Sequence, residues 1–250
     1  MKYFFFCILT SITFHSLSAQ EMYMKPLKDL INTEDPGWAM VLQWKKDAKN
    51  KIEILPKNPE KADTALYRTQ VTTRSPMGAI IYETGGILID HGWIRILGSG
   101  SEILTRDLPS WNKGKSFDQY GEIMPFLLIA DDAMGGFFAL NGGAFGHQDL
   151  GKVYYFAPDN LKWEPLNITY TDFIFWAFNG DIDQFYSGYR WENWKEDVEK
   201  MGPDRAMIFY PYLWSKYDNF NDLSRKDVPI SEMWTIQINF RNQLINVEME

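Results

Sequence analysis

Glycine is concentrated in the middle of this chain. Fourteen of its eighteen glycines lie between Gly78 and Gly151, among short runs of β-branched and aromatic residues. Glycine accepts positive φ angles and lets two backbones approach closely, so this arrangement is typical of hairpins and bulges. The segment therefore predicts short strands joined by tight turns.

Apolar runs between these glycines have the length of strands. The uninterrupted run Phe126–Ala130 indicates a central strand covered on both faces, because strands buried on two sides lose the usual polar alternation. The expected strands cover residues 79–82, 87–89, 93–97, 126–130, 137–140, 153–156 and 161–163.

Helical signals flank this β-rich segment. Asp35-Pro36 and Asn58-Pro59 each place a capping residue before a proline at the first helical position. Thr169 and Asp172 form a capping box before an apolar run that Gly180 ends. Further helices are expected at 181–187 and 191–201 and a strand at 207–214, while the pattern from Ile230 leaves helix or strand open.

The order of these elements predicts an α+β fold with a glycine-rich, mostly antiparallel central sheet between N-terminal and C-terminal helices. No linker or repeat divides the chain, so we expect a single domain over residues 20–250. Its expected parts are a helical segment (20–68), a β-rich core (69–165) and a largely helical segment (166–250).

The N-terminus has the parts of a secretory signal. Lys2 precedes a mostly apolar run over residues 3–14, and small residues at 16–19 predict cleavage after Ala19. The run is too short to cross a bilayer, which takes about 20 residues. We therefore expect residues 1–19 to be removed and the protein to be exported to the periplasm or beyond the cell.

The mature chain is expected to be cysteine-free and acidic. Cys7, the one cysteine, lies within the signal, so disulfides are not available after export. Removal of Lys2 leaves 24 basic residues against 33 acidic ones, a net charge of −9. This charge argues against binding to nucleic acids and to anionic membranes, both of which attract basic proteins.

Several sequence motifs occur in a fixed order, among them Glu83-Thr84-Gly85-Gly86 and Asp90-His91-Gly92-Trp93. The others lie at residues 70–78, 97–101, 130–132, 135–143 and 151–159. Together they resemble the bacterial family catalogued as domain of unknown function 2625, from about Leu27 to Phe240. The resemblance identifies related proteins, but it implies no particular reaction, because the activity of that family is not known.

A looser pattern covers residues 125–178. An apolar strand that ends in Ala130-Asp131-Asp132, a glycine-rich turn, two more strands and a helix at Asp172-Phe173 are similar to the SMI1/KNR4 (SUKH) group. Members of that group bind other proteins, often as immunity partners of toxins, and are mostly cytosolic. The resemblance therefore implies a SUKH-like fold and a protein-binding role.

Acidic residues and a histidine at the expected turns are the candidate catalytic groups. Neighbouring residues on a strand face opposite sides, so Asp131 and Asp132 converge only if the strand ends there; stabilising the turn is the alternative role. A carboxylate beside a histidine can orient a general base. The candidates are Glu83, Asp90, His91, Asp131 and Asp132.

No metal or cofactor is expected. A metal site would have to combine His91 and His147 with nearby carboxylates, and the chain has no paired-histidine helix motif and no cysteine ligands after export. The glycine-rich segments also lack the spacing of a nucleophile elbow or a phosphate-binding loop.

Polar and aromatic residues near the turns are the candidate binding groups, because tryptophan and arginine are common anchors of interfaces. They are Arg74, Trp93, Asn141, His147, Arg190 and Trp191. The alternative for Trp191 and Trp194, three apart on an expected helix, is that they bury one helical face.

These observations favour an exported, non-enzymatic module that binds another protein, and the SUKH resemblance implies a module of the immunity type. One alternative is a hydrolase of glycans or peptides that uses the clustered carboxylates and His91. A second is a carbohydrate-binding module with Trp111, Trp191 and Trp194 exposed.

Overall fold

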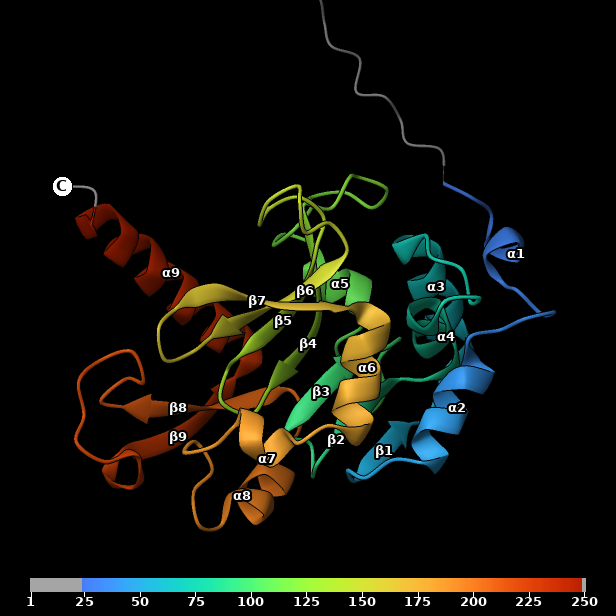
Figure 1. Ribbon diagram of the computed structural model, residues 1–250. Coiled ribbons are helices and arrows are strands. Elements are labelled where there is room, and N and C mark those ends of the chain that lie inside the picture. Colours follow the sequence, from blue (N-terminus) through green and yellow to red (C-terminus); the bar gives the residue numbers. More distant parts are fainter. Residues whose placement is uncertain (1–23, 249–250) are drawn as a thin grey trace, which may run out of the picture.

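A seven-stranded antiparallel sheet forms the centre of the protein, whose computed structural model describes residues 24–248 (Figure 1). The strands follow one another across the sheet in chain order. They are β1 (Ile52–Leu55), β2 (Gly86–Ile89), β3 (Ile94–Leu97), β4 (Phe126–Asp132), β5 (Phe137–Asn141), β6 (Lys152–Ala157) and β7 (Lys162–Thr169). The α+β prediction is confirmed; the signal expected at residues 1–19 lies outside the described residues.

Strand β4 is the middle strand of the seven, as its apolar run predicts. All of its residues except Phe126 are buried. Its end pairs with β3, so that Ile94 lies opposite Asp132 and Arg95 opposite Asp131. This register places the end of β4 next to the turn that joins β2 to β3.

Helices that precede and follow the central strands in the sequence pack together (Figure 1). They are α1 (Leu27–Leu30), α2 (Trp38–Lys46), α3 (Pro59–Thr69), α4 (Pro76–Glu83) and α6 (Tyr170–Asn179). Both α2 and α4 contact α6. The predicted caps of α3 and α6 are confirmed: Asn58 accepts a hydrogen bond from the Lys61 amide, and Thr169 and Asp172 form a reciprocal capping box. Helix α2 starts after Gly37, two residues later than expected.

The strand expected at residues 79–82 is wrong, because this segment lies in α4. Ser75 caps the helix by accepting a hydrogen bond from the Gly78 amide at 3.1 Å, and Pro76 stands at its first position. Residues 77–81 are all buried, and a helix buried on every side has the same uninterrupted apolar run as a strand. Gly78 is required for packing, since a Cβ there would lie 2.1 Å from the Thr72 carbonyl oxygen.

The segment 166–250, expected to be largely helical, contains a separate two-stranded sheet of β8 (Arg205–Tyr210) and β9 (Ser224–Pro229). Strand β9 was not predicted because only Val228 is buried and the other residues are mostly polar. The remaining elements are α5 (Leu108–Asn112), α7 (Ile182–Phe185), α8 (Trp194–Met201), the short 3₁₀ helix η1 (Phe220–Asp222) and α9 (Ile230–Glu248).

The chain after Ile230 is helical, which resolves the open alternative. Met233 and Gln237 are buried and four residues apart, so they lie on one face of α9. In residues 24–248 no helix is long and apolar enough to span a membrane.

Candidate functional site at the β2–β3 turn

Three successive residues with positive φ form the turn between β2 and β3. The φ angles are 49° at Asp90, 62° at His91 and 82° at Gly92. The Trp93 amide closes the turn by donating to the Asp90 carbonyl at 3.1 Å, and the Asp90 amide donates to the Lys51 carbonyl. Left-handed backbone at a non-glycine residue costs about 1–3 kcal/mol and is concentrated at functional sites. The turn is therefore held in a strained conformation by its surroundings.

His91 belongs to a small network of charged side chains. Its Nδ1 atom lies 2.6 Å from Oε1 of Glu199, and Lys51 Nζ lies 3.0 Å from the same oxygen. The hydrogen bond with His91, followed by that from Lys51, lowers the pKa of Glu199. Both Lys51 and Glu199 are more than half exposed, so this network is open to a ligand or partner.

Asp90 pairs with Arg190 on the other side of the turn. Arg190 Nη2 lies 2.6 Å from Asp90 Oδ2, and Nη1 contacts the exposed carboxylate of Asp183. The guanidinium also lies 4.0 Å from the centre of the Trp194 ring, a cation–π arrangement. Arg190 is thus fixed from two directions at the surface.

A buried aromatic cluster supports the turn from beneath. Trp93 is fully buried, with ring centres 5.0 Å from Trp194, 5.7 Å from Trp191 and 5.3 Å from Tyr186. Trp191 is 2% exposed and its Nε1 donates to Asp197. Five residues predicted separately thus meet at this turn: Asp90, His91, Trp93, Arg190 and Trp191. The two tryptophans support the site and do not form its surface.

Two surface hollows flank the turn. One, of about 290 Å³, is lined by His91, Glu199 and Ile103 among others, and the other, of about 390 Å³, by Asp90, Arg190 and Lys195 among others. Lys51 lines both. The turn is therefore a ridge between two hollows that contain charges of both signs. We call this surface the turn site.

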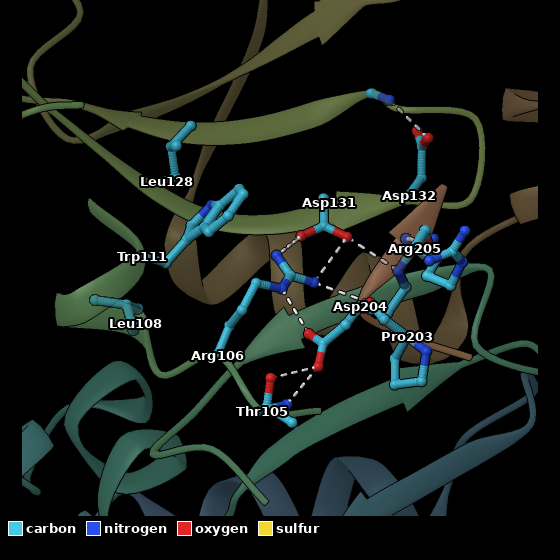
Figure 2. A network of polar contacts seen from close by, with 12 residues as sticks. Thr105, Arg106, Leu108, Trp111, Leu128, Asp131, Asp132, Pro203, Asp204 and Arg205 are labelled. Atoms are coloured by element: carbon cyan, nitrogen blue, oxygen red, sulfur yellow. Dashed lines mark hydrogen bonds and ion pairs between the residues drawn. The ribbon is translucent and has the colours of Figure 1, made fainter. Parts of the chain in front are cut away.

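Asp131 has a different role, in the buried ion-pair network that Figure 2 shows. The carboxylate is fully buried between Arg95 Nε at 2.9 Å and Arg106 Nη1 at 2.5 Å. Arg106 Nε in turn lies 2.8 Å from Asp204, which precedes β8. The network connects the central sheet to the β8–β9 hairpin. Its two arginines are balanced by its two aspartates.

Asp132 stabilises the β4–β5 turn, as the turn interpretation predicts. Its Oδ1 accepts hydrogen bonds from the amides of Met134 and Gly136, and its Oδ2 from the hydroxyls of Tyr155 and Tyr186. Burial raises the pKa of Asp132, although the bonds from Tyr155 and Gly136 oppose this effect. Both carboxylates of the Asp131-Asp132 pair are thus engaged inside the protein.

A protein-family model described as "Protein of unknown function DUF2625" matches residues 27–233. The chain belongs to this family. It is 47% identical over 214 residues to the Escherichia coli protein "Putative uncharacterized protein YbfG", covering 86% of this chain and 96% of that protein. An "Uncharacterized protein" of Haemophilus influenzae is 47% identical over 190 residues, covering 76% of this chain and 83% of that protein.

No solved structure matches this chain. The SUKH-like arrangement expected for residues 125–178 therefore stays a prediction, while membership of the DUF2625 family is established. Three of the sequence motifs on which the resemblance was based, at 83–86, 90–93 and 130–132, fall on the approach to β2, the β2–β3 turn and the end of β4.

Two further candidates lie away from the turn site. Glu83 pairs with Lys57 at 3.1 Å, at the end of β2 opposite to the turn, and exposed Arg74 lies 3.7 Å from Asp35. The expected convergence of all five catalytic candidates is therefore not observed. Asp90 and His91 are adjacent at the surface, Asp131 and Asp132 are engaged in the interior, and Glu83 lies elsewhere.

Asn141 and His147 lie in another part of the molecule, at the end of β5 and in the loop that follows it. The Asn141 side chain accepts hydrogen bonds from the amides of Gly143 and Phe145 and donates to the carbonyls of Gly146 and Asp149. His147 is exposed on this loop. Within residues 24–248, no group of three or more histidine, cysteine, aspartate or glutamate side chains is placed to hold a metal.

Sequence reasoning missed Lys51, Glu199, Arg106 and Asp204. Glu199 lies 108 positions from His91, and Asp204 lies 98 positions from Arg106. No local pattern marks residues that meet over such separations, because only the folded sheet and α8 bring them together.

Proposed function

We propose that the protein is an exported binding module that recognises another protein through the turn site. The observation that carries this proposal is the strained ridge of Asp90 and His91 between two charged hollows. A fixed ridge with hollows on both sides suits a partner that covers the whole surface, because pre-organised contacts bind without paying an ordering cost.

The charges of the turn site support a polar interface. Lys51, Asp183 and Glu199 are each more than half exposed, and their partners hold them in defined positions. Charged groups in a protein interface mainly determine specificity and the rate of association. Since the chain carries a net charge of −8, we infer that the partner has a net positive charge.

The proposal is tested by affinity capture from the native envelope fraction with the full mature chain and two charge-reversal variants. Asp183→Lys changes an exposed acid of the turn site, and Asp218→Lys is the matched control at an exposed acid outside both hollows. We expect the wild type and Asp218→Lys to recover the same basic protein and Asp183→Lys to lose it. Equal recovery by all three variants, or no specific protein, would contradict the proposal.

Export is a separate part of the proposal. The predicted cleavage site after Ala19 precedes the family match, which starts at residue 27. We expect the protein released from the cell envelope to begin at Gln20, as measured by mass spectrometry of its N-terminal peptide. An intact Met1 in a protein confined to the cytosol would contradict export.

Hydrolysis is the second candidate function, favoured by the contact of His91 with Glu199. A carboxylate on Nδ1 holds the imidazole so that Nε2 can act as a general base. Turnover of a glycan or peptide by the wild type, reduced at least about a hundredfold in Glu199→Gln, would establish this role. Equal turnover in both proteins would exclude it.

A further inference from the structure

The largest hollow of those described lies on a different part of the surface, between β6–β7 and α9. Its volume is about 560 Å³, within the range of small-ligand sites. Its lining combines rings with cations: Phe126, Ala144, Phe145, Tyr154, Asn160, Leu161, Lys162, Trp163, Arg241 and Leu244. We call this hollow the aromatic groove.

Four rings form a continuous aromatic surface in the groove. Phe145 is at their centre, with its ring centre 4.6 Å from Tyr154, 4.8 Å from Trp163 and 5.9 Å from Phe126. Trp163 and Phe145 are only partly buried, in contrast to the tryptophans of the turn site. The groove therefore offers ring surface to a ligand.

The loop that carries Phe145 is held in place from both sides. Asn141 accepts a hydrogen bond from the Phe145 amide at 3.1 Å, and Tyr154 donates to Asp149 at 2.8 Å. This bracing gives Asn141, a binding candidate from the sequence, an indirect role as a positioning residue of the groove.

Two cations at the groove have no acidic partner among the side chains that the structure describes. Lys162 and Arg241 line the groove, and neither makes an ion pair or a side-chain hydrogen bond there. In a chain with a net charge of −8, two cations beside an aromatic surface that pair with no described acid favour an anionic ligand.

We propose that the aromatic groove binds an acidic glycan, an oligosaccharide that contains uronic acid units. The weakly positive C–H groups of a sugar ring suit the negative faces of Phe145 and Trp163. The sugar carboxylate pairs with Arg241, and Lys162 supplies a second cationic donor at the groove. Asn160 is engaged within the protein, since its side chain donates to Glu164 and accepts from the Lys162 amide. This site lies apart from the turn site and does not depend on the protein-binding proposal.

The experiment is calorimetric titration of the mature chain at low salt with a galacturonate oligosaccharide, an uncharged glucose oligosaccharide of equal length and a polyglutamate peptide. We expect the galacturonate to bind most tightly and to weaken as salt rises. Arg241→Gln is expected to weaken it about tenfold, since it removes a charge-assisted hydrogen bond. Lys61→Ala, which removes an exposed lysine of α3, is the matched control and should bind as the wild type does.

Trp163→Ala is the second test and should abolish binding. Its folding is verified by circular dichroism, and Arg241→Gln keeps the proposal testable if Trp163→Ala does not fold. Equal affinity for charged and uncharged sugars, tighter binding of polyglutamate, or no effect of Arg241→Gln would each overturn the proposal. Variants of the turn site should leave this binding unchanged, which separates failure here from failure of the proposed function.

Discussion

Two acidic motifs at the same end of the sheet have opposite environments. Asp131 is fully buried and pairs with Arg95 and Arg106, whereas Asp90 and His91 lie in a strained surface turn beside exposed Glu199 and Lys51. In the sequence both read as carboxylates at turns. The comparison teaches that burial, and not residue type, decides the role of these acids. Buried Asp131 stabilises the fold, whereas Asp90 and His91 at the surface can contact a partner.

The largest expected effect is at the buried motif. Asp131→Asn leaves Arg95 and Arg106 as buried cations without their shared partner, so the free energy of unfolding should fall by about 3–5 kcal/mol. Urea unfolding of the purified variant measures this change. The control is Asp227→Asn, which breaks the exposed pair with Arg205 and should cost about 1 kcal/mol or less. Equal losses of unfolding free energy in Asp131→Asn and Asp227→Asn would contradict the claim that the buried pair contributes more than the exposed one.

A smaller loss is expected at the neighbouring carboxylate. Tyr155→Phe removes a hydroxyl that donates to buried Asp132 at 2.7 Å, and should lower the free energy of unfolding by about 1–3 kcal/mol. Thermal and urea unfolding provide the measurement. The matched variant Tyr189→Phe removes a partly buried bond to Asp159 and should cost less. A Tyr155→Phe protein as stable as the wild type would show that Asp132 needs no such donor.

The ion-pair network also predicts a pH dependence through Asp204. Partial burial raises its pKa, but hydrogen bonds from Arg106 and Thr105 outweigh this and leave it below 3.8. A lowered carboxyl pKa contributes stability that is present above the unfolded value and is lost as the pH falls through the folded value. The wild type should therefore exceed Asp204→Asn by about 1–2 kcal/mol near pH 6, with the difference shrinking as the pH falls below 3.8 towards the lowered pKa.

This difference is measured by urea unfolding of both proteins across that pH range. A difference that is constant with pH, or that grows towards acid, would contradict the assignment of Asp204 to the network.

The smallest stability effect is expected at the turn site. His91→Gly relieves a left-handed backbone, but it loses the contact with Glu199 and adds about 0.5–1 kcal/mol of chain entropy that glycine must give up on folding. These opposing effects should leave a net change in the free energy of unfolding of about 1 kcal/mol or less. Capture of the partner should nevertheless be lost, because the side chain forms part of the ridge. A strongly destabilised His91→Gly variant would show that His91 stabilises the fold, and would contradict the contrast drawn with buried Asp131.

Much of the architecture follows from local sequence. Caps such as Asn58 and Thr169 and the apolar run from Phe126 identify helix starts and the central strand, because they depend on neighbouring residues only. The helix at Ala79–Tyr82 was mistaken for a strand since burial on all sides removes helical periodicity. Strand β9 was missed because a mostly exposed hairpin strand needs few apolar residues.

The sites were harder to predict for a physical reason. Asp90, His91 and Arg190 could be named as candidates from residue type, but the partners of His91, Lys51 and Glu199, come from the segment before β1 and from α8. Asp131 and Asp90 have the same chemistry in sequence, and only the surrounding structure decides that one is enclosed. Trp163, which the sequence placed in a strand, is the tryptophan of the aromatic groove.

Photo-crosslinking in living cells tests the role of the turn site most directly. A photoreactive residue replaces Lys195, which lines one of its hollows, or Lys216, an exposed lysine that lines neither. We predict one specific protein adduct from position 195, none from position 216, and loss of the adduct when Asp183→Lys is added. Equal adducts from both positions, or none from position 195, would contradict the turn site as the contact surface.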